Sequence, residues 1–133
     1  MKPKEIKYSK DLEWLIPFVN SVSDIVPIDM IKSIRTYKIK PGLKSQTYGS
    51  IIIKKNSFSI NICAYAYQED TEKYRSETIA VILDTLAHEL SHMLHLDHNY
   101  KHFKIQALIL LKFSRILKKL RISDTSARFN NLG

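Results

Sequence analysis

All five histidines of this 133-residue chain lie in one short window, between His88 and His102. Upstream of this window and within it, apolar residues recur at intervals of three and four, which is the period of an amphipathic helix. The period predicts one long helix from about residue 74 to residue 95 or 96. The candidate caps are Ser76 with Glu77 nearby, or Glu72 further upstream. Any fold of this chain must therefore carry a histidine-rich helix.

Two runs of β-branched and aromatic residues precede this helix. They are "TYGSIIIKK" at 47–55 and "SFSINICAYAY" at 57–67, and "KKNS" between them predicts a hairpin turn. In the second run, Phe58, Ile60, Ile62 and Ala64 share one face of the predicted strand. Further upstream, residues 9–22 have a helical spacing, with Ser9 as a candidate cap and Pro17 as a candidate kink or end. Residues 29–39 fit either a helix or a strand.

The segment "LDHN" at 96–99 breaks the long helix, and either Asp97 or Asn99 could cap the next one. A second helix is predicted over 100–120, and the polar tail at 122–133 is expected to be loosely ordered. The order is helix, strands, helix, helix, which indicates an α+β fold with a small antiparallel or mixed β-sheet. At this length the whole chain, 1–133, forms a single domain.

Composition narrows the cell compartment and the kind of partner. A net charge of +8 favours anionic partners, with nucleic acid before anionic membrane. One cysteine, Cys63, excludes an internal disulfide framework. The charged start, "MKPKEIKYSK", is unlike a signal peptide, and no apolar run reaches the ~20 residues of a membrane span. We therefore expect an intracellular protein, cytoplasmic or nuclear, with no membrane partner.

A basic surface could bring the chain to DNA, although the same charges could simply be solvated. The candidate cations are Lys101, Lys104, Lys112, Arg115, Lys118 and Lys119 on the last helix, and Lys38, Lys40, Lys44, Lys54 and Lys55 around the strands.

The segment "HELSH" places His88 and His92 one helical turn apart on the same face, a spacing that can bind one Zn²⁺. Glu89, next to the first histidine, could act as general base towards a water on the metal. Zinc lowers the pKa of such a water towards ~7 and polarises a scissile carbonyl, which suits amide hydrolysis. The pattern therefore predicts a zinc cofactor and a catalytic Glu89.

A catalytic zinc usually takes three protein ligands and keeps one position open. His95 lies a rise of ~10 Å beyond His88 on a straight helix, too far for one ion to bond both. His98 follows the helix break, where the chain can turn back, and is the favoured third ligand. His102 is the second choice, or it packs or supports a ligand. Asp97 and Asp84 could each hydrogen-bond a ligand imidazole from behind, or serve only as a cap and a polar helix residue respectively.

The spacing H-E-x-x-H-x5-H also occurs in metzincins. That class needs glycine at the position of His95 and a methionine turn downstream, and this chain has no methionine after Met93. The metzincin class is therefore disfavoured.

The stretch "HELSHMLHLDHNYKHFKI" resembles the SprT-like/WLM/YgjP group of small zinc metallopeptidases, over about residues 85–105. The matching positions are His88, Glu89, Leu90, His92, His95, His98 and Phe103, while His102 stands where the group has an aromatic residue. The resemblance implies zinc ligation by the residues His88, His92 and His98, with Glu89 as general base. It also implies a minimal zincin-like core, and several members of the group act on proteins bound or crosslinked to DNA.

The leading expectation is thus a zinc-dependent peptidase whose peptide substrate adds as a strand to a sheet edge. The expected edge is the run at 59–67, where Tyr65 or Tyr67 could line the cleft or donate to the oxyanion. Either tyrosine could instead be a half-buried sheet residue. The alternative function is a zinc-binding module that binds nucleic acid, or regulates, without proteolysis.

Overall fold

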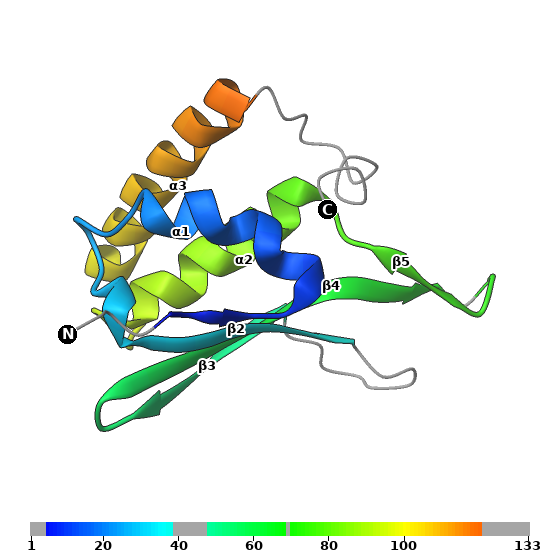
Figure 1. Ribbon diagram of the computed structural model, residues 1–133, viewed down its shortest axis with the longest axis horizontal. Coiled ribbons are helices and arrows are strands. Elements are labelled where there is room, and N and C mark those ends of the chain that lie inside the picture. Colours follow the sequence, from blue (N-terminus) through cyan, green and yellow to red (C-terminus); the bar gives the residue numbers. More distant parts are fainter. Residues whose placement is uncertain (1–4, 39–47, 69, 121–133) are drawn as a thin grey trace.

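The structure of the protein, a computed structural model, describes residues 5–38, 48–68 and 70–120. The expected loose tail at 122–133, and Lys40 and Lys44 of the basic set, lie outside the described residues. The fold is α+β: α1, α2 and α3 lie on the same face of a mixed five-stranded sheet (Figure 1). In chain order the elements are β1 (Lys7–Tyr8), a 3-10 helix (Lys10–Leu15), α1 (Ile16–Asn20), a 3-10 helix (Ile28–Met30), β2 (Ile31–Lys38), β3 (Gly49–Lys54), β4 (Ser57–Gln68), β5 (Lys73–Ser76), α2 (Ile79–His92) and α3 (Tyr100–Leu120).

Strand β4 is the centre of the sheet. It pairs in parallel with β2 and antiparallel with both β3 and β5, and the strand order is β1-β2-β4-β3 with β5 also on β4. Tyr65 of β4 pairs with Lys38 of β2 on one side and with Ser76 of β5 on the other. β5 therefore lies along the same side of β4 as β3, further along the strand. The expectation that residues 59–67 form a free edge is therefore wrong. Among the described strands, β3 pairs only with β4 and leaves its outer edge free.

The face pattern predicted for β4 is confirmed where the helices cover it. Ile60, Ile62 and Ala64 are fully buried and pack in one core with residues of α2. Burying such side chains contributes about 1.5–3 kcal/mol each for the larger ones. Cys63, on the opposite face, is buried as well, and its thiol donates to the Tyr65 carbonyl oxygen at 3.0 Å.

Helix α2 begins later than the apolar period predicts. Tyr74 lies in β5, paired with Tyr67, and the helix starts at Ile79. Thr78 is its N-cap, because its hydroxyl accepts a hydrogen bond from the Val81 N–H at 3.1 Å. The predicted start was too early because the apolar spacing of three and four extends into residues that form β5. Such spacing is a local property and gives no information about pairing with a distant strand. The helix ends at His92, and the following turn leads to His98.

The N-terminal helical segment is split in two. A 3-10 helix covers Lys10–Leu15, and Pro17 lies in the first turn of α1, where a missing N–H costs nothing. Ser9 does not cap with its side chain, since its hydroxyl accepts from the Thr36 N–H at 2.9 Å and joins this segment to β2.

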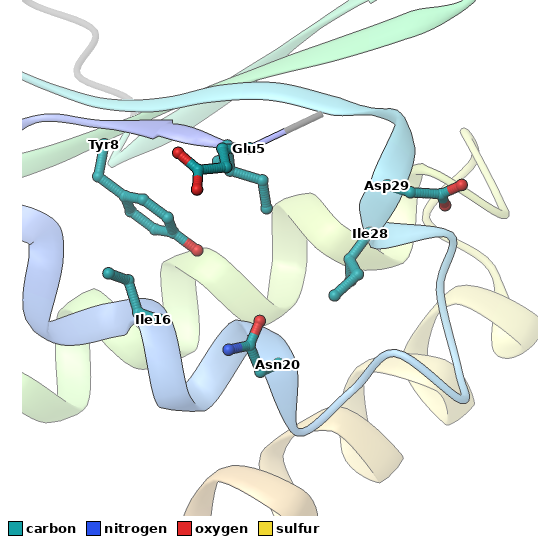
Figure 2. A pocket seen from close by; sticks show the side chains of 7 residues that line it. Glu5, Tyr8, Ile16, Asn20, Ile28 and Asp29 are labelled. Atoms are coloured by element: carbon teal, nitrogen blue, oxygen red, sulfur yellow. The ribbon is translucent and has the colours of Figure 1, made fainter. Parts of the chain in front are cut away.

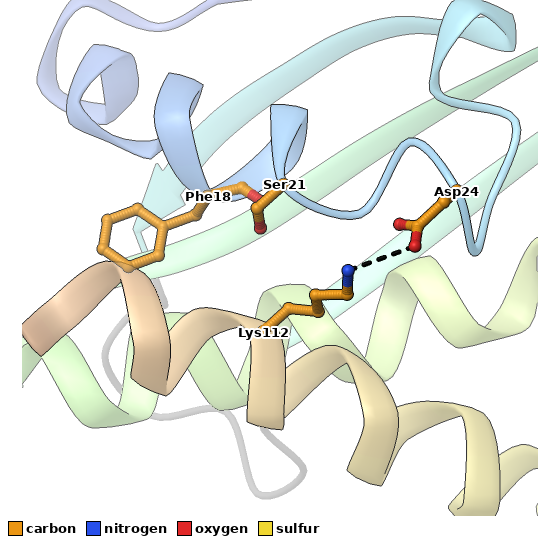
Figure 3. Close-up of polar contacts among 4 residues, drawn as sticks. All are labelled: Phe18, Ser21, Asp24 and Lys112. Atoms are coloured by element: carbon orange, nitrogen blue, oxygen red, sulfur yellow. Dashed lines mark hydrogen bonds and ion pairs between the residues drawn. The ribbon is translucent and has the colours of Figure 1, made fainter. Parts of the chain in front are cut away.

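Helix α3 is held over α1 and α2 by core and polar contacts. Asn99 caps it by accepting from the His102 N–H at 3.1 Å, which is one of the two predicted caps. The Phe18 and Phe113 rings meet edge to face, with ring centres 5.6 Å apart. Lys112 forms a 3.1 Å ion pair with Asp24, which Figure 3 shows. No described helix has the length and apolar character needed to cross a membrane. The cap, the ring contact and the ion pair together hold α3 so that its first turns lie beside the histidines of α2.

Candidate metal centre

Three imidazoles converge at the end of α2. The Nε2 atoms of His88, His92 and His98 are 3.2, 3.1 and 3.0 Å apart in pairs. His88 and His92 come from one face of α2, and His98 comes from the turn that follows, as the helix break at 96–99 predicted. We call these three atoms the imidazole triangle. With His102, these residues form a group whose ligand atoms lie within 4.8 Å of one another and could hold a metal ion.

The donor chemistry of the triangle fits a cation. The His92 Nδ1 is 3.0 Å from the His95 carbonyl oxygen, which can only accept, so this nitrogen carries the proton. The Nε2 of neutral His92 then presents a lone pair to the other two rings. A zinc ion at ~2.0–2.1 Å from three tetrahedrally arranged nitrogens spaces them by ~3.3 Å. The observed spacings of 3.0–3.2 Å are close to that value.

His102 lies behind the triangle. It is fully buried, and its ring centre is 4.4 Å from that of His92. Its Nε2 is 3.2 Å from the carbonyl oxygen of His88 and donates to it, while its buried Nδ1 has no hydrogen-bond partner in the part of the chain that the structure describes. Burial lowers the pKa of His102, so the neutral ring is favoured. His102 therefore packs against the other histidine rings and supports the backbone of α2 through the His88 carbonyl, and its Nδ1 is the nitrogen that it could offer to a metal ion.

Asp84 reaches the cluster through a residue that the sequence did not single out. The Gln106 side chain, from α3, lies with its Oε1 3.1 Å from His88 Nδ1, and its Nε2 is 3.5 Å from Asp84 Oδ1. The three side chains form a line that supports the His88 ring from behind. Gln106 sits on a different helix from the motif, and only the packing of α3 on α2 brings it there, so no local sequence signal marks it.

Glu89 points a buried carboxyl group into the same region. Its exposed fraction is 4%, and among the described residues its Oε2 has no hydrogen-bond partner. Burial raises the pKa of Glu89 to about 7, against a smaller lowering effect from His98. A carboxyl group with a pKa near 7 can both accept and donate a proton near neutral pH.

A cleft of about 450 Å³ opens over these groups, which we call the histidine cleft. It is lined by Tyr48, Gly49, Asp84, Thr85, His88, Glu89, His92 and His98. The start of β3 forms one wall and α2 the other. Gly49 permits this close approach, because a Cβ there would lie 2.5 Å from Thr85 Cγ2 and 3.2 Å from Glu89 Cγ.

The tyrosine in the histidine cleft is Tyr48, which precedes β3 and is 52% exposed. Neither tyrosine singled out from the sequence lines it. Burial, with a hydrogen bond to Asp11, raises the pKa of Tyr65 to about 12, so its hydroxyl faces the N-terminal 3-10 helix. Tyr67 instead packs edge to face on Tyr74, with ring centres 5.4 Å apart.

Asp97 and His95 flank the third imidazole without their side chains joining the triangle. Asp97 is exposed, and within the described residues it makes no hydrogen bond to an imidazole, while Asn99 takes the capping role. His95 contributes its backbone carbonyl, which orients His92.

A second hollow, of about 490 Å³, lies between β1, α1 and the second 3-10 helix (Figure 2). The Tyr8 hydroxyl and the Asn20 amide point into it between walls that include Ile16 and Ile28. Burial raises the pKa of Tyr8 to about 12. Glu5 and Asp29 also line this hollow, but no described histidine or cysteine does, so of these two hollows only the histidine cleft is lined by histidines.

Comparison of the chain with protein-family models, with curated proteins and with solved structures found no match. The assignment of a function therefore depends on the residues of the histidine cleft.

Proposed function

We propose that the protein is a zinc-dependent peptidase of the SprT-like/WLM/YgjP type. The observation that carries the proposal is the convergence of three imidazole nitrogens at 3.0–3.2 Å beside a buried carboxyl group. A purely structural zinc site usually has four protein ligands and needs no carboxylate next to them. An open cleft over three nitrogen donors and Glu89 supports a hydrolytic centre instead.

His88, His92 and His98 are the proposed ligands. Imidazole nitrogens suit zinc, copper, iron and nickel, and zinc fits a hydrolase because it has no redox chemistry of its own. When bound, zinc would supply a Lewis acid for the scissile carbonyl and acidify the attacking water. His102 is proposed as a bracing residue and not as a fourth ligand. Its Nε2 donates to the His88 carbonyl, and among the described residues its Nδ1 makes no close polar contact with the imidazole triangle.

Glu89 is the proposed general base and acid. Its carboxylate takes one proton from water at the unpartnered Oε2, while the water oxygen bonds to the peptide carbonyl carbon. The same proton then passes to the leaving amine as the carbon–nitrogen bond breaks.

The free outer edge of β3 is the proposed peptide track. No described strand pairs with β3 on that side, and its first residue, Gly49, lies in the wall of the histidine cleft. An extended peptide can add to such an edge by main-chain hydrogen bonds. Tyr48, at the start of this track, is placed to contact the substrate chain at the cleft.

Protein substrates bound to DNA are the proposed targets. The chain has a net charge of +8, and α3 carries six cations and no acidic residue. Within residues 5–38, 48–68 and 70–120, the pair between Lys112 and Asp24 is the only ion pair, so the other α3 cations have no acidic partner there. Such unpaired charge favours a polyanion.

The same charge supports a second candidate, a zinc-binding module that binds nucleic acid without proteolysis. This candidate keeps the metal and the DNA affinity but assigns no task to Glu89. The unpartnered carboxyl group of Glu89 in the histidine cleft favours the peptidase.

The test compares zinc-loaded wild type with Glu89→Gln on labelled casein and on histone bound to single-stranded DNA. We expect cleavage by wild type, a loss of about 10²–10⁴-fold in the variant, and equal zinc content in both. Zinc and DNA binding without cleavage by wild type would establish the second candidate. Equal cleavage by both proteins would exclude Glu89 as the base.

A further inference from the structure

The His88 ring is oriented by a side chain from another helix. Its Nδ1 lies 3.1 Å from Gln106 Oε1, and Gln106 Nε2 lies 3.5 Å from Asp84 Oδ1. Gln106 belongs to α3, while Asp84 lies one turn before His88 on α2. His92, in contrast, is oriented by the backbone carbonyl of His95.

The order of donors along this line is set by the carboxylate. An ionised Asp84 can only accept, so the amide nitrogen of Gln106 faces it and donates. The amide oxygen is then left for the ring, and His88 Nδ1 must carry the proton that this oxygen accepts. A neutral His88 with its proton on Nδ1 presents a lone pair at Nε2, which is the atom in the imidazole triangle.

We propose that Gln106 is a positioning residue that holds His88 in the Nδ1-protonated tautomer, with Asp84 fixing the direction of the Gln106 amide. The inference rests on the proposed metal centre but not on the peptidase reaction. Metal affinity then depends on the packing of α3 against α2, because α3 supplies Gln106.

The first test removes the acceptor with Gln106→Leu, and uses Ser114→Leu at an exposed, uncharged position of α3 as the matched control. Zinc affinity is measured by competition with a chromophoric chelator. Substitutions behind a metal ligand typically weaken affinity about 10–100-fold, and we expect a loss in that range for Gln106→Leu only. Wild-type affinity in Gln106→Leu would overturn the inference, whereas no zinc binding by wild type would instead remove the metal centre itself.

A second test reverses the direction of the hydrogen bonds that join Asp84, Gln106 and His88, and it leaves the hydrophobic core unchanged. In Asp84→Lys the new ammonium donates to the Gln106 oxygen, turns the amide and places donors against His88 Nδ1. We expect weaker zinc binding and a shift of the His88 ring proton to Nε2, read from ¹⁵N chemical shifts of the metal-free protein. Adding Gln106→Glu restores an acceptor for both neighbours, and we expect it to recover the affinity and the tautomer. If His88 in Asp84→Lys/Gln106→Glu still carries its proton on Nε2, the proposal is overturned. The tautomer is the deciding measurement, because restoring the net charge could recover zinc affinity without moving the proton back to Nδ1.

Discussion

Among single residues, Glu89 is the one whose burial most clearly affects how stability depends on pH. It is 4% exposed, has no partner at Oε2 within the described ranges, and has its pKa raised to about 7 by burial. A folded-state pKa above the unfolded value means that the folded protein holds the proton more tightly. The contribution to stability is then fully present below pH 4.5 and is lost as the pH rises through 7.

Replacing Glu89 by Gln should therefore stabilise the metal-free protein in a pH-dependent way. The amide does not ionise, so the gain over wild type should be small near pH 4.5 and reach about 1–3 kcal/mol above pH 8. Urea unfolding of chelator-treated wild type and Glu89→Gln at both pH values measures it, with exposed Glu13→Gln as the control. A gain of equal size at both pH values would contradict the burial of an ionisable Glu89.

Among the residues of the site, the sequence predicted those whose position depends on local spacing along the chain. The four-residue step from His88 to His92 and the helix break before His98 are both readable along the chain, and the structure brings these three rings together. Gln106 and Tyr48 could not be found that way. They reach the site from α3 and from the start of β3, and such long-range contacts leave no periodic trace in the sequence.

Among the elements, the contact between β3 and α2 sets the width of the histidine cleft. At Gly49 an added Cβ would meet Thr85 Cγ2 at 2.5 Å and Glu89 Cγ at 3.2 Å. Neither the strand nor the helix can shift freely, since β3 is paired with β4 along its length and α2 is packed in the core. A glycine here is a requirement of close packing between two elements.

Gly49→Ala should thus destabilise the protein by about 1–3 kcal/mol, as expected for overpacking. The companion change Thr85→Ser removes Cγ2 and keeps the hydroxyl that donates to the Val81 carbonyl at 2.8 Å. We expect Gly49→Ala/Thr85→Ser to regain much of the loss, as measured by urea denaturation of both single variants and the double variant. Losses that simply add would show that the clash is not with Thr85.

Element type was easier to predict than element order. The hairpin turn between β3 and β4, the Asn99 cap and the second long helix are confirmed, because turn residues, caps and helical period are local properties. The first long helix exists, but its predicted start was wrong, since residues 73–76 form β5. Residues 29–39 fitted two structures, and pairing of β2 with β4 decided for a strand. That pairing also places β4 in the middle of the sheet, which is why β4 cannot offer the free edge that was predicted for it and the proposed peptide track lies on β3.

For the whole molecule, a bound metal should contribute directly to stability. An ion that binds only the folded chain stabilises it by about 2.7 kcal/mol at a free concentration of 100 times Kd. Zinc should therefore raise the Tm of wild type, chelator should reverse the rise, and His98→Ala should lose most of it. Differential scanning calorimetry with and without zinc provides the measurement. A Tm that does not respond to zinc in wild type would contradict a folded metal site.

The most direct test of the account is the metal content of the purified protein, determined by elemental analysis after loading with zinc and removal of the excess. His98→Ala removes one corner of the imidazole triangle, whereas His102→Phe keeps the triangle and replaces only the ring behind it. We predict about one zinc per chain in wild type and in His102→Phe, and a sharp loss in His98→Ala. No zinc in wild type, or a loss in His102→Phe with retention in His98→Ala, would contradict the metal centre described above.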